Sequence, residues 1–133
     1  AKIIKSNCEV NSINLRHPGG ASGYKFETDN GTFCYLLDHE YDDESAPEII
    51  HSTNNSDFVI WDGMFTSEEL SMRKGWGHSS ISQGSEFLDI TNAKKMGISH
   101  HSPYRDDKDM AVLEKDITNK NLFLAREGQI IKI

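Results

Sequence analysis

The chain has 133 residues, about one domain on the usual scale of roughly 100 to 200 residues, so we expect a single domain over 1–133. Its 14 Lys and Arg residues against 21 Asp and Glu give a net charge of −7. This acidic excess argues against a protein that binds nucleic-acid backbones in general. No apolar stretch reaches the roughly 18 residues of a membrane helix, and AKIIKSNCEV lacks the apolar run of a signal peptide. We therefore expect a soluble, cytoplasmic protein with no membrane partner.

The first forty residues predict a short antiparallel meander. Residues 8–15 alternate in polarity as a strand does, and TFCYLLD (32–38) is an almost wholly apolar strand. Between them, HPGGASG (17–23) is a glycine-rich turn, YKFET (24–28) is a further strand, and DNG (29–31) is a hairpin turn. Cys8 and Cys34 lie inside these strands without CxxC spacing, so we expect two buried free thiols, with a single disulfide as the alternative.

The rest of the chain alternates between predicted helices and strands. Residues 41–55 suit a helix start or an exposed loop, and DFVIWD (57–62) is a buried strand. A capping pattern predicts a short helix at 66–72, and apolar spacing predicts helices at about 79–95 and in the acidic segment that follows Arg105. KMGIS (95–99) is a brief strand, and residues 121–133 are expected to form a closing hairpin. This order predicts an α/β or α+β fold with helices on one sheet face.

Histidines and carboxylates gather at the predicted strand ends, where sites are commonly built. His17 opens the HPGG turn, whose glycines let the backbone pass close to a ligand, and His78 follows glycines in GWGHSS. Asp38 and Asp62 end the two most apolar strands. Imidazole and carboxylate ligands suit zinc or manganese. Taken singly, each His has an ordinary packing or surface role as its alternative, and each Asp a role as a cap or turn former.

The adjacent pair His100 and His101 follows the strand at 95–99. Successive side chains of a strand point to opposite faces, so both rings cannot approach the same point. We expect at most one of the two to be a metal ligand.

Five segments in order carry a family resemblance across nearly the whole chain: HPGGASGYKFE, FCYLLDHE, DFVIWDGMFTSEE, KGWGHSS and ISHHSPYRDD. Together they resemble the C-terminal half of metallo-β-lactamase-fold hydrolases, nearest the phosphodiesterase branch that includes tRNase Z and cyclic-nucleotide phosphodiesterases. The resemblance implies half of an αββα sandwich, which is one mixed sheet with helices on one face.

The resemblance also implies roles for the matching residues. His17 is similar to the third ligand of a first metal, Asp38 to the carboxylate that bridges two metals, and His100 to the terminal ligand of the second metal. His78 resembles the catalytic histidine that contacts the scissile phosphate, and Asp62 matches the acid that holds it. Two zinc or manganese ions are implied for the complete fold.

One departure from the family is large, because the defining HxHxDH motif occurs nowhere in these residues. A single half would expose the apolar inner face of its sheet, which soluble proteins rarely leave bare. We therefore expect a partner, either a second half-domain or a second copy in a homodimer. A piece of a longer enzyme, a natural half and a degenerate relative all fit these residues.

Two functions follow from the resemblance. Completed by the missing half, the chain is expected to be a metal-dependent phosphodiesterase; the acidic balance favours a small or cyclic nucleotide over structured RNA. The alternative is a catalytically silent half-domain that binds nucleotides or a protein. In either case Trp76 is expected first as a packing residue, with a pocket wall as the alternative, and Arg105 as a solvated residue at a helix start.

Overall fold

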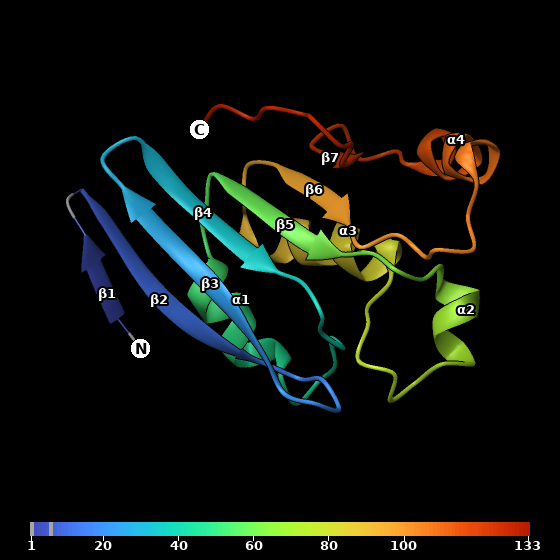
Figure 1. Ribbon diagram of the computed structural model, residues 1–133, viewed down its shortest axis with the longest axis horizontal. Coiled ribbons are helices and arrows are strands. Elements are labelled where there is room, and N and C mark those ends of the chain that lie inside the picture. Colours follow the sequence, from blue (N-terminus) through green and yellow to red (C-terminus); the bar gives the residue numbers. More distant parts are fainter. Residues whose placement is uncertain (1, 6) are drawn as a thin grey trace.

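A computed structural model describes residues 2–5 and 7–133 of the chain, with side chains from residue 7 onward. These residues form one seven-stranded sheet in the order β1-β2-β3-β4-β5-β6-β7 (Figure 1). The strands are β1 (Lys2–Lys5), β2 (Cys8–Leu15), β3 (Ala21–Thr28), β4 (Gly31–Leu36), β5 (Phe58–Asp62), β6 (Met96–Ser99) and β7 (Leu122–Leu124). The pairs from β1 to β4 are antiparallel, and those from β4 to β7 are parallel.

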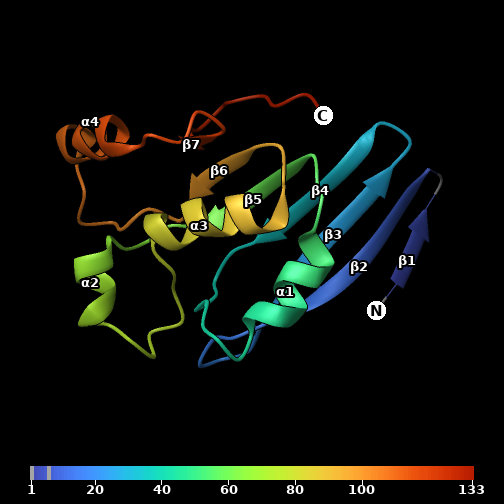
Figure 2. The ribbon, with the colours of Figure 1, turned by 180° about the vertical axis from the view of Figure 1, so that it is seen from behind.

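The sheet is covered by helices on one face. Helices α1 (Ala46–Thr53) and α3 (Ile81–Thr91) lie together over this face (Figure 2), whereas α2 (Ser67–Ser71) and α4 (Asp107–Asp116) lie beyond the carboxyl ends of β5 and β6 (Figure 1). A mixed sheet with helices on one face confirms the fold class expected from the sequence. No described helix is both long and apolar enough to cross a membrane.

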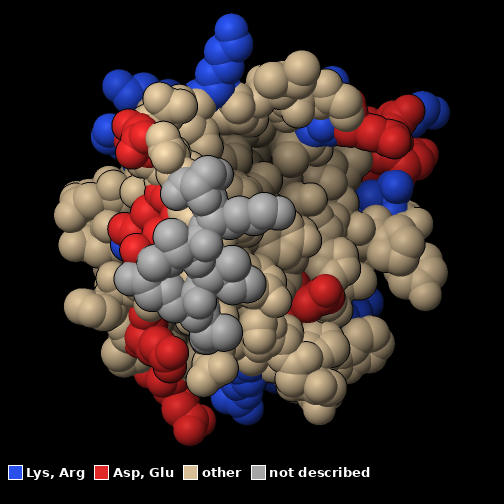
Figure 3. Space-filling model, turned by 60° about the vertical axis from the view of Figure 1, so that its left-hand side comes forward, with Lys and Arg blue, Asp and Glu red and all other residues tan. Residues whose placement is uncertain are grey.

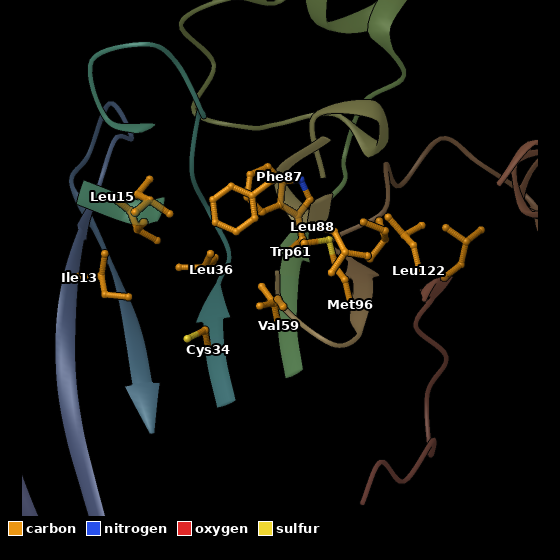
Figure 4. Packing of buried hydrophobic residues seen from close by; sticks show 14 residues of the cluster. Ile13, Leu15, Cys34, Leu36, Val59, Trp61, Phe87, Leu88, Met96 and Leu122 are labelled. Atoms are coloured by element: carbon orange, nitrogen blue, oxygen red, sulfur yellow. The ribbon is translucent and has the colours of Figure 1, made fainter. Parts of the chain in front are cut away.

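The core lies between the sheet and the helices α1 and α3 (Figure 4). It forms because the strands turn alternate apolar residues toward this side. Its fully buried members include Cys34, Leu36, Ile49, Val59, Trp61, Phe87, Met96 and Ile98. Cys34 is therefore a buried thiol as predicted, and burial raises its pKa. Cys8 is only partly buried, so the prediction was wrong for that residue; both cysteines are free.

Helix α3 is shorter than the predicted 79–95, and Ile90, which apolar spacing places on one side with Ile81, Phe87 and Leu88, is exposed. Its start is fixed by Ser80, whose hydroxyl accepts a hydrogen bond from the Gln83 amide, and its end by Asn92 in the left-handed conformation, φ 51°. Ile90 is 55% exposed, whereas Gly84 is buried against the sheet. The helix packs so closely there that a Cβ on Gly84 would lie 2.8 Å from Trp61 Cδ1. Gly84 thus lets the helix approach the sheet.

The chain ends differ from the prediction as well. Residues 121–133 do not form a hairpin, because β7 pairs in parallel with β6 and no later strand is present among the described residues. At the other end, β1 adds an antiparallel strand beside β2, ahead of the predicted meander.

The second face of the sheet carries a row of aromatic rings. Phe26, Phe33, Phe58 and Phe123 stack side by side across β3, β4, β5 and β7, with centroid separations of 5.5, 5.8 and 6.1 Å. Tyr24 and Tyr35, cross-strand neighbours, are 41% and 39% exposed. Figure 3, which turns the N-terminal edge of the sheet forward, shows a largely uncharged, hollowed surface with charged side chains grouped toward its rim. The apolar sheet face expected for a half-domain is therefore present.

Candidate active site

Three parallel strands deliver the central residues of the site to one edge of the sheet. Asp38 follows the end of β4, Asp62 is the last residue of β5, and His100 comes directly after β6. The carboxyl ends of adjacent parallel strands share an edge, where open α/β sheets bind ligands. The fourth residue, His78, arrives from the loop between α2 and α3.

These four side chains converge on one point. Asp38, Asp62, His78 and His100 each offer a ligand atom within 4.8 Å of those of the other three. Asp62 Oδ2 lies 2.9 Å from His78 Nδ1 and 3.1 Å from His100 Nδ1, and Asp38 Oδ1 lies 3.5 Å from His100 Nδ1. The sequence placed these residues at strand ends separately; the structure brings them together.

The backbone at two of these residues is unusual. Asp38 has φ 55° and His100 has φ 58°, the left-handed region that residues other than glycine rarely adopt. Such conformations concentrate at functional sites, where the surrounding structure holds them in place. Here they turn the chain sharply at the ends of β4 and β6.

Asp62 is fully buried and is held by backbone groups. Its Oδ2 accepts from the His39 amide at 3.3 Å, and its Oδ1 accepts from the Met64 amide at 3.1 Å. The carboxylate is therefore fixed in one orientation, with Oδ2 toward the two histidines. The neighbouring His39 ring packs edge-on against Trp61 at 4.6 Å, and burial lowers the pKa of His39 to about 4, so this ring is neutral near pH 7.

Glu40 holds the loop that carries His78. Its carboxylate accepts hydrogen bonds from the amide of Gly75, at 2.9 and 2.7 Å, and from the amide of Gly77, at 3.1 Å. Both glycines have positive φ, 86° and 90°, which aims their N–H groups into one anion-binding nest. Glu40 thereby ties the His78 loop to the end of β4.

A second connection lies just after His78. The Ser79 hydroxyl donates to the His39 carbonyl at 2.6 Å and accepts from the Tyr41 amide at 3.0 Å. The segment after β4 and the loop before α3 are thus joined on both sides of His78. Sequence reasoning pointed to Glu40 only as an acid that, with Asp38, closes the apolar strand, and it missed both the contact of Glu40 with the glycine loop and the role of Ser79. The paired glycines before His78 were the available sign.

His17 lies beside the four-residue cluster and is not part of it. Its ring is 5.7 Å from that of His78, edge to face, and its Nδ1 accepts from the Gly19 amide at 3.2 Å. The turn after β2 therefore directs this ring toward the site from the antiparallel half of the sheet. His101 is not in the cluster either, and burial lowers its pKa.

The donor set fits a metal ion. Two ligands about 2.1 Å from a zinc ion at a tetrahedral angle lie about 3.4 Å apart, close to the 3.5 Å between His100 Nδ1 and Asp38 Oδ1. Asp38 is half exposed and His100 partly exposed, so both are open to an incoming ion. His100 Nδ1 also lies 3.1 Å from Asp62 Oδ2, a contact that an ion at this nitrogen would replace. His78 Nδ1 lies 2.9 Å from the same oxygen, which leaves Nε2 as the free ring nitrogen of His78.

Two further residues lie elsewhere than predicted. Trp76 is 60% exposed and is not a packing residue. Arg105 is not solvated; its side chain is 8% exposed, donates to the Met64 carbonyl at 2.6 Å and pairs with the Glu69 carboxylate. Arg105 thus joins the turn after His100 to α2, because the fold brings these segments together across 36 residues of sequence.

No protein-family model and no curated protein sequence matches this chain. Solved structures do. Human tRNase Z, short form, superimposes with a TM-score of 0.75 at 17% identity, over 98% of this chain and 44% of that one. The metallo-β-lactamase fold protein YhfI from Bacillus subtilis gives 0.78 at 15% over 97% and 51%, and a diphosphatase from the PhnP family gives 0.68 at 16% over 97% and 44%.

These likenesses define the fold. The chain has the fold of about half of a metallo-β-lactamase-fold protein, and it spans roughly half the length of the structures it matches. The half-domain reading of the sequence is therefore confirmed.

Proposed function

We propose that this chain is one half of a metal-dependent phosphodiesterase that acts on small or cyclic nucleotides once a second half-domain completes it. The observation that carries this proposal is the convergence of Asp38, Asp62, His78 and His100 at one sheet edge. Human tRNase Z and a PhnP-family diphosphatase have the same fold and are in keeping with a phosphorus substrate, although an isothiocyanate hydrolase shares that fold as well.

Asp38 and His100 would hold zinc or manganese, with Asp38 shared between two ions and His17 as a ligand of the other. Bound divalent ions lower the pKa of water and neutralise charge on a phosphoryl group. This chain offers too few ligands for that alone, since catalytic zinc typically has three protein ligands. The remaining ligands would come from the half that carries the HxHxDH motif.

His78 would act on the leaving group. With Nδ1 donating to Asp62 Oδ2 at 2.9 Å, the ring points Nε2 away from the carboxylate. Asp62 orients the ring, so that a proton on His78 Nε2 can pass to the departing oxygen as the P–O bond breaks.

The partner would cover the aromatic sheet face. Phe26, Phe33, Phe58 and Phe123 form a flat apolar row that suits a second sheet packed about 10 Å away. A second half-domain is the proposed occupant, because it would also bring the missing metal ligands. A second copy of this chain in a homodimer would cover the face without supplying them.

The net charge of −7 supports a small substrate, since a structured RNA calls for basic patches.

The test joins this chain to the half of YhfI that the superposition leaves uncovered, either as a fusion or supplied in trans. Hydrolysis of a cyclic nucleotide and of a model phosphodiester is then measured with zinc or manganese added. A folded, metal-loaded assembly that turns over neither compound with either metal contradicts the proposal.

The second candidate is a catalytically silent half-domain that binds a nucleotide or a protein. The absence of HxHxDH from these residues favours it. Calorimetric measurement of metal and nucleotide binding, first to the isolated chain and then to the completed assembly, separates the candidates. Weak metal binding that becomes tight with the second half supports the enzyme, whereas nucleotide binding without any metal dependence in the completed assembly supports the silent module.

A further inference from the structure

A groove of about 520 Å³ opens beside His78 and belongs to no role described so far. It runs between α2, the turn after His101 and helix α4. Phe65, on its wall, has its ring centroid 5.9 Å from that of His78, and Trp76, another wall residue, precedes His78 by two positions. A ligand in this groove would therefore contact Phe65, whose ring in turn lies against His78 of the proposed active site.

The walls of the groove are aromatic and accessible. Trp76 is 60% exposed and Tyr104 is 93% exposed, whereas aromatic side chains such as Trp61 and Phe87 are fully buried in the core. The apolar surface between them comes from Phe65, Val112 and Leu113. Exposed Trp and Tyr rings at one cavity are a usual platform for a planar group, which they bind by stacking.

The groove also holds a cation that carries no ion pair. Arg73 has its guanidinium carbon 5.5 Å from the Phe65 centroid and 5.8 Å from the Trp76 centroid, and it donates only to the Glu69 carbonyl at 3.3 Å. Among the described residues, no carboxylate pairs with it. The Glu69 carboxylate is taken by Arg105, and Asp109 caps the first turn of α4 by accepting from the Asp106 amide.

From these features we infer that the groove is a base-binding site for a nucleotide. The nucleobase stacks on Trp76 and Tyr104, and the Arg73 guanidinium pairs with a phosphate oxygen of the same nucleotide. A planar aromatic group and an anion in one small molecule match the two features of the groove together. This inference rests on the proposed function, because it names the part of the substrate that is bound beside His78.

Tryptophan fluorescence of the isolated chain tests the inference, because Trp61 is fully buried and Trp76 is the exposed reporter. The titration is done in EDTA with AMP, adenosine and ribose 5-phosphate as probes. We expect saturable quenching by AMP, weaker binding of adenosine and no effect of ribose 5-phosphate. Trp76→Phe should remove the signal.

Two variants separate the base from the phosphate. Tyr104→Ala should weaken AMP about tenfold, in line with the loss of one stacking partner. Arg73→Gln should weaken AMP and leave adenosine unchanged. The control is Ile130→Ala, which changes an 85% exposed apolar residue that does not line the groove and should leave AMP binding unchanged.

Fluorescence that does not respond to AMP overturns the inference, as does an equal loss of AMP binding in Ile130→Ala and Tyr104→Ala. Because the titration needs no metal and no second half, it is independent of catalysis. A completed assembly that hydrolyses phosphodiesters while Trp76 stays silent would refute the groove and leave the proposed function intact. AMP binding in the groove together with no hydrolysis by the completed assembly would support the groove and refute the proposed function.

Discussion

Asp62 Oδ2 lies 2.9 Å from His78 Nδ1, and this contact fixes which nitrogen of His78 faces outward. With Nδ1 directed at Asp62, Nε2 is the ring nitrogen of His78 that is left for the proposed proton transfer. The same oxygen is 3.1 Å from His100 Nδ1, so Asp62 also contacts a proposed metal ligand. One buried carboxylate therefore connects the two proposed parts of the site.

Asp62→Asn should lower turnover of the completed enzyme about 10- to 100-fold, as the loss of an orienting partner typically does. Nitrogen NMR of the isolated chain gives a second readout, because the His78 tautomer should shift away from Nδ1–H. The control is Asp107→Asn on the exposed start of α4. An unchanged His78 tautomer would show that Asp62 does not set it.

Glu40→Gln should free the loop before His78. The Gly75 amide donates to both carboxylate oxygens, and a glutamine has an NH₂ group, which cannot accept, in place of one of them. Hydrogen exchange at the Gly75 amide should therefore rise about tenfold. Glu44→Gln, whose side chain is 92% exposed, is the matched control. Slow exchange retained in Glu40→Gln contradicts the role of the nest.

Gly84→Ala should destabilise the chain by about 1–3 kcal/mol, the usual cost of overpacking a core. The added Cβ would lie 2.8 Å from Trp61 Cδ1 and 3.0 Å from Ile98 Cδ1, so the helix must move away from the sheet. Urea unfolding measures the change, with Glu86→Ala on the exposed side of α3 as control. A stabilised Gly84→Ala protein would mean that helix propensity outweighs packing here.

The aromatic sheet face should drive self-association of the isolated chain. Tyr24→Lys combined with Tyr35→Lys places two charges on this face and should shift the chain toward the monomer in size-exclusion chromatography with light scattering. Tyr104→Lys, outside the face, should not. If the doubly substituted chain associates as the original does, the contact lies elsewhere.

Asp57 should make stability depend on acid pH. The Lys94 side chain, at 2.5 Å, and the Thr32 amide, at 2.8 Å, hold the pKa of Asp57 below its ordinary 3.8. Its contribution to stability is therefore present above that value and is lost as the pH falls through the lower, folded-state pKa. Asp57→Asn should make the midpoint of unfolding depend less on pH between about pH 4 and pH 2. A pH dependence that is as steep as in the original chain excludes Asp57 as its source.

The sequence alone determined the features that depend on neighbours along the chain. Alternation and apolar runs located β2 to β6, and a capping pattern located α2, where the Thr66 hydroxyl accepts from the Glu69 amide. The ordered motifs also identified half of a metallo-β-lactamase fold. These predictions succeeded because strand polarity and helix caps are encoded within a few residues.

Only the tertiary structure determined the features that depend on contacts between residues far apart in the sequence. Asp62 meets His100 across 38 residues, and Glu40 meets Gly75 across 35, so neither relationship has a local pattern. The same is true of β7, whose three residues chose a parallel partner in β6 where the sequence indicated a hairpin. Trp76 and Arg105 were misplaced for this reason as well: exposure and pairing depend on which segments the sheet brings side by side.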